Sequence, residues 1–449
     1  MDYKFSVVMP LYNAATYLEE TVESILQQSI GFSDNIQIIF VDDGSTDNTG
    51  SICDSFCKEY PENIVYVKQA NAGVSAARNA GIPYVKGKYV NFMDDDDLWD
   101  ANAFKTAWDM LEAHEEIDVV ACRMDFFEGR TGYHKLDYKF DAGDMICDIH
   151  EHPTFGQYSV SSAFCRTSAI GDLTYDTRLS YGEDAKFIIS LILKKEKYGL
   201  LRSAEYHIRR HLDESSLTQN KRNKETAYLD TASYYYKYLA DHSLSLYGCV
   251  IPFIQHCLIN AIKYRVNAEI PDSIPAEISG PYIDILSELI LLFDDDVICS
   301  ARNISMQTKL YFLGQKYGAE KLAEMITFKK RFAYINGLRI GAVFGKNSLV
   351  IENENKSLLK TVVSGSIRCP LFVKELSLKL SCGSKDYDCE LKYAPAKNHL
   401  SYKGESMNSI YDFCVRVPSR TYSNRDGIVW TAVADGKEFN VTAVTSSTP

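Results

Sequence analysis

The sequence GKYVNFMDDDD, residues 87–97, places four consecutive aspartates directly after an apolar run. The apolar run is typical of a strand that enters a hydrophobic core. Four adjacent carboxylates repel one another and are costly to desolvate unless a cation lies among them. Capping of a helix that begins near Asp100 is the alternative, but it accounts for one or two carboxylates rather than four. Such hard oxygen ligands suit Mg²⁺ or Mn²⁺ bound to phosphate oxygens.

The length and composition predict a globular protein with several domains. A chain of 449 residues with 46% hydrophobic residues is too long for one ordinary core, so two or three domains are expected. No apolar run approaches the roughly 20 residues of a membrane-spanning helix, and residues 1–5 lead into a strand without a signal-peptide pattern. The 12 cysteines lack metal-ligand spacing, which indicates reduced thiols of a cytoplasmic protein.

The charge is unevenly distributed along the chain. The net charge of −12 argues against nucleic acid as the main partner. Residues 331–449 contain 16 Lys and Arg against 11 Asp and Glu, or +5, while residues 1–330 contain 32 against 49, or −17. This asymmetry suggests two modules with different partners, although surface charge that drifted for solubility explains it as well.

Strand and helix signals alternate along the first 120 residues. Regular alternation implies a mainly parallel sheet with helices on both faces. In such sheets ligands bind outside the carboxyl ends of the strands, so Pro10, Asp43 and residues 94–97 should share one crevice. The expected strands are residues 5–9, 36–41, 64–67, 89–93 and 118–121, and the expected helices are residues 16–28 and 76–85.

Two further regions follow this α/β domain. We expect an α/β domain over residues 1–221, which includes an amphipathic helix over residues 183–195, and a helical domain over residues 222–330. Residues 331–449 show short alternating runs broken by turns such as Asp435-Gly436, which predicts a small β-sandwich-like module.

Polar residues follow the first two expected strands. Pro10 ends the ladder and exposes backbone groups, and Tyr12 offers a flat ring to a base, although Pro and Asn also form ordinary turns. In the second motif one of Asp42 and Asp43 can accept a hydrogen bond from a base, but helix capping explains these residues equally well.

Two more motifs supply polar groups to the same region. Gly73 allows close backbone approach, and Arg78 and Asn79 offer fixed polar groups, although this string alone could be an ordinary loop that enters a helix. Asp184 stands at a helix start, where a carboxylate usually caps the helix but can also act as a general base.

Together these motifs resemble the family 2 glycosyltransferases of the GT-A fold, and above all bacterial enzymes of teichoic acid and capsule synthesis. The resemblance covers about residues 4–215 and implies a Rossmann-like nucleotide-sugar-binding domain that transfers a sugar with inversion. The strings that carry it are SVVMPLYN (6–13), VDDGSTD (41–47), NAGVSAARNAG (71–81), FMDDDD (92–97) and GEDAKF (182–187).

The resemblance also implies a role for individual residues. Asp184 would be the catalytic base and Asp96 the direct ligand of Mn²⁺ or Mg²⁺. Asp95, where many relatives have serine, would lie near the ribose. The residues implied to bind the UDP-sugar donor are Pro10, Tyr12, Asp43, Asn71, Arg78, Asp94, Asp95, Arg210 and His211. The last two belong to the segment Arg209-Arg210-His211, which resembles the family's basic segment that closes over the diphosphate.

The resemblance implies a hexosyl- or N-acetylhexosaminyltransferase. Its donor would be a UDP-sugar and its acceptor a glycan or polyol-phosphate polymer, or the lipid-linked precursor of that polymer. Such an enzyme would be cytoplasmic, with peripheral membrane association, homo-oligomerisation and fusion to a further domain left open. A non-catalytic scaffold that binds polymer, and a metal-dependent phosphoryl- or nucleotidyltransferase, are the alternatives.

Overall fold

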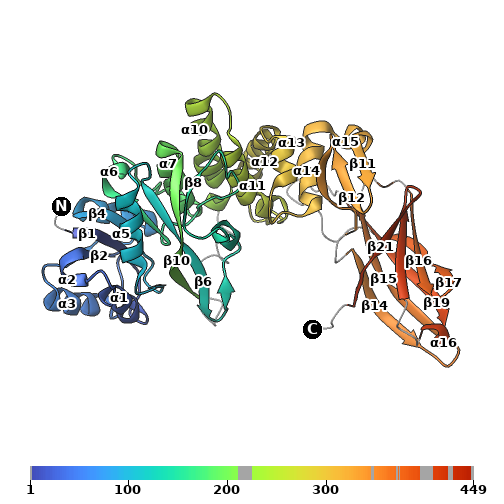
Figure 1. The fold of residues 1–449 in the computed structure, drawn as a ribbon, viewed down its shortest axis with the longest axis horizontal. Helices are drawn as coiled ribbons and strands as arrows, with labels where there is room; N and C mark the ends of the chain where they lie inside the picture. Colours follow the sequence, from blue (N-terminus) through green and yellow to red (C-terminus); the bar gives the residue numbers. More distant parts are fainter. Residues whose placement is uncertain are drawn as a thin grey trace. The chain divides into compact units, whose positions relative to one another are not determined.

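The computed structural model describes residues 3–210, 225–344, 348–370, 373, 375–394, 408–422 and 428–445 (Figure 1). The chain divides into two compact units. One contains Met1–Cys257 and Pro271–Ile285, and the other contains Leu258–Ile270 and Leu286–Pro449. The three-domain division at residues 221 and 330 stays a prediction.

A large mixed sheet forms the centre of the first unit. β1 to β4 run parallel to one another, as the alternation of strand and helix signals predicts. The remaining strands include antiparallel pairs, so the sheet is less parallel than expected. In spatial order the strands are β3 (Ile64–Lys68), β2 (Ile36–Asp42), β1 (Tyr3–Leu11), β4 (Gly87–Phe92), β9 (Ala163–Arg166), β6 (Val119–Glu128), β10 (Lys197–Arg210) and β5 (Leu98–Trp99).

The short strand β9 explains the departure from a parallel sheet. It lies between β4 and β6 and is antiparallel to both. The strand expected over residues 118–121 is therefore present as the start of β6 but does not pair with β4. Asn91 of β4 donates hydrogen bonds to the carbonyl oxygens of Ser161 and Ala163, which ties the strand before the four aspartates to the segment that leads into β9.

Helices cover both faces of this sheet, as expected. One hydrophobic core joins alternate residues of β1, such as Phe5 and Val7, to α1 (Leu18–Leu26), α3 (Thr49–Glu59) and α5 (Ala103–Ala113). On the opposite face, a Cβ added at Gly81 of α4 (Val74–Gly81) would lie 2.5 Å from Cγ1 of Val8. Phe187 of α7 (Glu183–Lys195) packs edge-on against Phe92 on that face.

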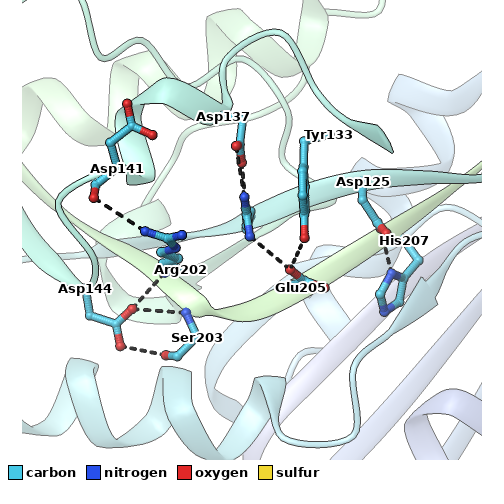
Figure 2. A network of polar contacts seen from close by, with 10 residues as sticks. Asp125, Tyr133, Asp137, Asp141, Asp144, Arg202, Ser203, Glu205 and His207 are labelled. Atoms are coloured by element: carbon cyan, nitrogen blue, oxygen red, sulfur yellow. Dashed lines mark hydrogen bonds and ion pairs between the residues drawn. The ribbon is translucent and has the colours of Figure 1, made fainter. Parts of the chain in front are cut away.

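A bulge in β10 determines which side chains after it lie on the same face of the strand. The register against β6 shifts between Leu201 and Glu205. Asp144, which precedes β8 (Met145–Asp148), accepts hydrogen bonds from the backbone N–H of Arg202 and the backbone N–H and hydroxyl of Ser203 (Figure 2). Because side chains alternate beyond the bulge, Glu205, His207 and Arg209 share one face of β10.

The predicted helical region is helical up to Met325. Among the described residues no helix is both long and apolar enough to span a bilayer. The main helices are α10 (Tyr238–Tyr247), α11 (Pro252–Val266), α12 (Ala276–Leu291), α13 (Asp295–Ser300), α14 (Met306–Tyr317) and α15 (Ala319–Met325).

Three antiparallel strands follow these helices. The first lies at the end of the region that was expected to be helical, and the other two lie in the region expected to be the β module. They are β11 (Ile326–Lys329), β12 (Phe332–Ile335) and β13 (Leu338–Ala342). They form a small sheet of their own, distinct from the two sheets that come after them in the sequence.

The C-terminal residues form a β-sandwich, as predicted. Leu349, Val363 and Val415 of one sheet and Leu380 and Trp430 of the other share one buried core. Asp435 and Gly436 have φ of 48° and 76° and join β20 to β21, which confirms the predicted hairpin turn. One sheet contains β18 (Glu390–Ala394), β19 (Asn408–Pro418), β15 (Lys360–Pro370), β14 (Leu349–Lys356) and β22 (Ala443–Thr445), and the other contains β17 (Lys385–Asp388), β16 (Leu376–Cys382), β20 (Ile428–Ala434) and β21 (Lys437–Val441).

Candidate active site

Asp43 organises the loop that leads into α4. Its side chain is 4% exposed and accepts hydrogen bonds from the backbone N–H groups of Ala72 (2.8 Å) and Gly73 (2.7 Å), and from the side chain of Gln69. A Cβ added at Gly44, which has φ of +79°, would lie 3.0 Å from the backbone nitrogen of Asn71, so only glycine allows this approach. The structure thus joins Asp43, which follows β2, to the loop between β3 and α4 that contains Asn71.

Arg78 joins the four aspartates after β4 to the carboxylate at the start of α7. Its side chain is 3% exposed, and its guanidinium contacts Asp94 at 2.9 Å and Asp184 at 2.6 Å. Burial lowers the pKa of Arg78, but Asp184 and Asp94 raise it above its ordinary range, so the guanidinium stays charged. Asp94 and Asp184, which lie 16 and 106 positions from Arg78 in the sequence, therefore contact the same cation.

Two contacts hold Arg78 in this position. Its guanidinium lies 5.3 Å from the centre of the Tyr175 ring, and that ring is stacked on Phe187 of α7 at 4.2 Å. The amide of Asn79 exchanges two hydrogen bonds with the backbone of Tyr175. Asn79 therefore positions Tyr175. The sequence analysis expected Asn79 instead to offer a polar group to the crevice.

The start of α7 sets the direction of Asp184. Gly182 precedes the helix in a left-handed conformation, with φ of 86°, and a Cβ there would lie 2.4 Å from the ring of Tyr235. Only glycine combines this backbone conformation with this close approach. Asp184 then lies in the first helical turn, where the helix dipole favours a negative charge.

The four aspartates after β4 have different surroundings. Burial and the neighbouring Asp96 and Asp94 raise the pKa of Asp95 to about 7, although its carboxylate accepts a hydrogen bond from the backbone of Tyr12. Burial, with Asp94 and Asp96, also raises the pKa of Asp97 well above its usual range. A divalent cation near these carboxylates would relieve this repulsion, so their chemistry suits Mn²⁺ or Mg²⁺.

Arg209 is a residue of this site whose contacts the sequence did not reveal. Its side chain is 2% exposed and pairs with Glu20 of α1 at 2.6 Å and with Glu128 at the end of β6. Its Nε donates to the carbonyl oxygen of Asp96 at 2.7 Å, and its backbone N–H donates to Asp97 at 2.8 Å. Arg209 therefore fixes the backbone that carries the expected metal ligand.

The remaining predicted residues lie around this centre. Pro10 is on β1 beside Val41 of β2 and does not end the ladder as expected, because the pairing continues to Leu11 beside Asp42. Tyr12 follows with 54% of its side chain exposed. Arg210 is the last residue of β10, and its guanidinium lies 4.8 Å from the centre of the Phe126 ring rather than on a carboxylate. His211 lies outside the described residues.

Ser161 is a further contact that sequence reasoning missed. Its hydroxyl is buried and donates to Asp94 at 2.9 Å. The segment before β9 carries no recognisable string, so only its pairing beside β4 brings Ser161 to the acidic residues. Asp94 is thus held on one oxygen by Arg78 and on the other by Ser161.

A second polar cluster lies on β6 and β10. The ligand atoms of Asp125, Glu205 and His207 lie within 4.8 Å of one another, and His207 Nδ1 is 2.6 Å from Asp125 (Figure 2). Arg123 contacts Glu205 at 3.5 Å and also pairs with Asp137 through two nitrogens. Because the Arg123 cation already faces Glu205, we interpret this cluster as ion pairs that hold the two strands together.

The strand ends, the acidic residues after β4 and the carboxylate at the start of α7 define a nucleotide-sugar-binding domain of the GT-A type. Residues 6–169 match the family model of Glycosyl transferase family 2. This N-terminal region is therefore similar to glycosyltransferase family 2, and two curated relatives support the match.

Two curated relatives come from Bacillus subtilis (strain 168). The minor teichoic acid biosynthesis protein GgaB is 35% identical over 357 residues, which cover 78% of this chain and 39% of GgaB. The minor teichoic acid biosynthesis protein GgaA is 32% identical over 262 residues, which cover 58% of this chain and 59% of GgaA. The chain therefore spans less than two thirds of the length of either relative.

Solved structures confirm the fold. S. aureus TarS matches 99% of this chain and 79% of its own, with a TM-score of 0.56 and 15% identity. TarS 1–349 in complex with UDP-GlcNAc matches 74% of this chain and 96% of its own, with a TM-score of 0.53 and 17% identity. At these identities the likeness concerns the fold alone.

Proposed function

We propose that this chain transfers a sugar from a UDP-sugar to a hydroxyl group of a bacterial surface polymer, such as teichoic acid or capsule, or of its lipid-linked precursor. The transfer inverts the anomeric centre and depends on Mn²⁺ or Mg²⁺. The observation that carries this proposal is the contact of one buried cation, Arg78, with both Asp94 and Asp184. That contact holds the expected general base beside the acidic residues that would hold the metal ion for the donor diphosphate.

The donor side of the proposed site combines a loop, a ring and a cation. Asp43 shapes the loop of Asn71, and the exposed ring of Tyr12 offers a surface for the uracil. Asp96 would hold the cation, with Asp94 and Asp95 beside it. When bound, the cation would neutralise the diphosphate and make UDP a better leaving group.

Asp184 serves as the general base in this proposal. Arg78 and the start of α7 orient its carboxylate, which would accept the proton of the acceptor hydroxyl as that oxygen attacks the sugar. Such help is worth roughly 10²–10⁴-fold in rate. Inversion needs no covalent intermediate, because the hydroxyl displaces UDP directly from the opposite face of the sugar.

The proposed polymer acceptor is inferred from the relatives of this chain. GgaB and GgaA are named as minor teichoic acid biosynthesis proteins, and TarS has been solved with UDP and with UDP-GlcNAc. We infer a donor of the same nucleotide class, an acceptor of the same polymer class, and action in the cytoplasm or at the inner face of the membrane.

A UDP-release assay tests the proposal. Wild-type protein would be given a panel of UDP-sugars and a polyol-phosphate acceptor, with Mn²⁺, Mg²⁺ or EDTA. We expect release from one sugar, its loss in EDTA and in Asp96→Ala, and a loss of about 10²-fold or more in Asp184→Asn.

The matched control is Asp109→Asn. Asp109 lies on α5, is more than half exposed and, among the described residues, forms an ion pair only with Lys105, so the same charge change there should leave UDP release intact. Failure of the wild-type protein to bind UDP or release it from any sugar would contradict the proposal. It would favour the scaffold or the phosphoryltransferase alternative.

A further inference from the structure

A pocket of about 600 Å³ lies within the second unit, apart from the residues of the candidate active site. It is formed where α13 and the start of α14 meet β13 of the small three-stranded sheet. Its lining residues are Cys299, Ile304, Met306, Gln307, Lys309, Arg339, Ile340, Gly341 and Ala342. Two of them are cations and none is acidic.

The two cations lack a counter-charge among the described residues. Lys309 is 9% exposed, and its ammonium donates to the carbonyl oxygen of Cys299 at 2.5 Å. Arg339 stacks its guanidinium over Phe332 of β12 at 3.7 Å. No ion pair to a carboxylate is formed by either residue within the described segments, unlike Lys316 of the same helix, which pairs with Asp295.

An unpaired buried cation carries an energetic cost that a bound anion would relieve. Burial lowers the pKa of Lys309, and the nearby charge of Arg339 lowers it further. Buried charges in proteins are ordinarily paired, and Lys is rarely buried without a partner. Solvent exposure alone would explain why Arg339 has no carboxylate partner, but it does not explain why Lys309 has none.

The start of α14 adds a third positive feature. Met306 and Gln307, the first two residues of this 12-residue helix, line the pocket, and Ser305 caps the helix by accepting a hydrogen bond from the N–H of Thr308. A helix N-terminus carries unsatisfied N–H groups and a partial positive charge. The dipole, the ammonium and the guanidinium therefore act on the same pocket.

We propose that this pocket binds a phosphate group of the acceptor polymer. The planar fork of Arg339 suits two phosphate oxygens, while Lys309 supplies a compact charge in the same pocket. The proposal rests on the proposed function for the nature of the polymer. A polymer repeats its phosphate along its length, so it offers this pocket many equivalent ligand groups.

Binding experiments without donor test this site independently of catalysis. Isothermal titration calorimetry would measure the affinity of the full chain for a short polyol-phosphate oligomer and for inorganic phosphate. We expect Arg339→Gln to weaken oligomer binding by about tenfold or more, as for the loss of a charge-assisted hydrogen bond. Lys329→Gln is the matched control, because Lys329 is an exposed cation of β11 in the same small sheet.

Each outcome decides the question. Wild-type affinity for the oligomer in Arg339→Gln would overturn the proposal. Binding of inorganic phosphate that depends on Arg339 but that the oligomer does not displace would assign the pocket to free phosphate and overturn the acceptor assignment. UDP binding should be unchanged in both variants, so failure of the proposed function would be visible separately as absent UDP release.

Discussion

Arg78 is the residue on which the geometry of the candidate active site depends. It is buried, it contacts carboxylates from two distant motifs, and its Nε has no hydrogen-bond partner among the described residues. Lysine could not replace it, because an ammonium on a flexible stem cannot hold two carboxylates in a fixed plane. The arginine therefore sets the separation and the direction of Asp94 and Asp184.

We predict that Arg78→Lys lowers UDP release by about 10²-fold while the protein stays folded, since a small misplacement of a catalytic group costs that much. Steady-state UDP release and circular dichroism would measure the two effects. Arg178→Lys is the control, because Arg178 is 57% exposed and its one ion pair within the described segments is with Asp176. Full activity in Arg78→Lys would show that the paired geometry is not needed.

At the residue scale the sequence predicted the motif positions but not their partners. The strings place Asp43, Arg78, Asp94 and Asp184 at element ends, and the structure brings the last three together. Ser161 gave no such signal, and Arg209 was expected only as part of a basic segment over the diphosphate. Their contacts depend on strand pairing and on a bulge that no local pattern encodes.

At the element scale, long periodic segments were predictable and short inserted ones were not. The helix expected over residues 183–195 is α7, and four expected strands are β1 to β4. β9 has four residues and β5 has two, too few to show periodicity, and both depend on neighbours for their pairing. The order of the strands after β4 could therefore not be predicted from the sequence.

The short helix η2 (Asp137–Phe140) contains a buried lysine whose pKa is lowered. Lys139 is 1% exposed and donates hydrogen bonds to Gly156 and Gln157. Burial lowers the pKa of Lys139 from 10.5 to about 7. Between these values the unfolded chain holds a proton that the folded chain does not, so the free energy of unfolding should rise with pH.

We predict a rise of up to about 1.4 kcal/mol per pH unit from this one proton above pH 7, and no contribution to the slope below it. Urea unfolding between pH 6 and 9.5 would measure the slope in wild type and in Lys139→Met, which should lack this component. Lys105→Met, at an exposed position of α5, is the control and should keep the wild-type slope. Parallel curves for wild type and Lys139→Met would contradict the assignment.

At the scale of the whole molecule, the chain contains two units with separate cores. The core that supports the candidate active site joins β1, β2 and their helices, and the sandwich core joins its two sheets. The two cores have no residue in common. The sequence predicted a sandwich from turn spacing and alternation, but it did not separate the small sheet of β11 to β13, because short alternating runs look alike in both.

We predict that damage to the sandwich core leaves donor binding intact. Trp430 is 4% exposed and packs edge-on against Phe413, so Trp430→Ala should destabilise the sandwich by about 3–5 kcal/mol. Hydrogen exchange of the β20 amides would measure that loss, and calorimetry would measure UDP affinity, which should stay within twofold of wild type. Val429→Ala, at an exposed position next to it, should change neither quantity. Loss of UDP binding in a Trp430→Ala protein with an intact first unit would show that the sandwich supports the donor site.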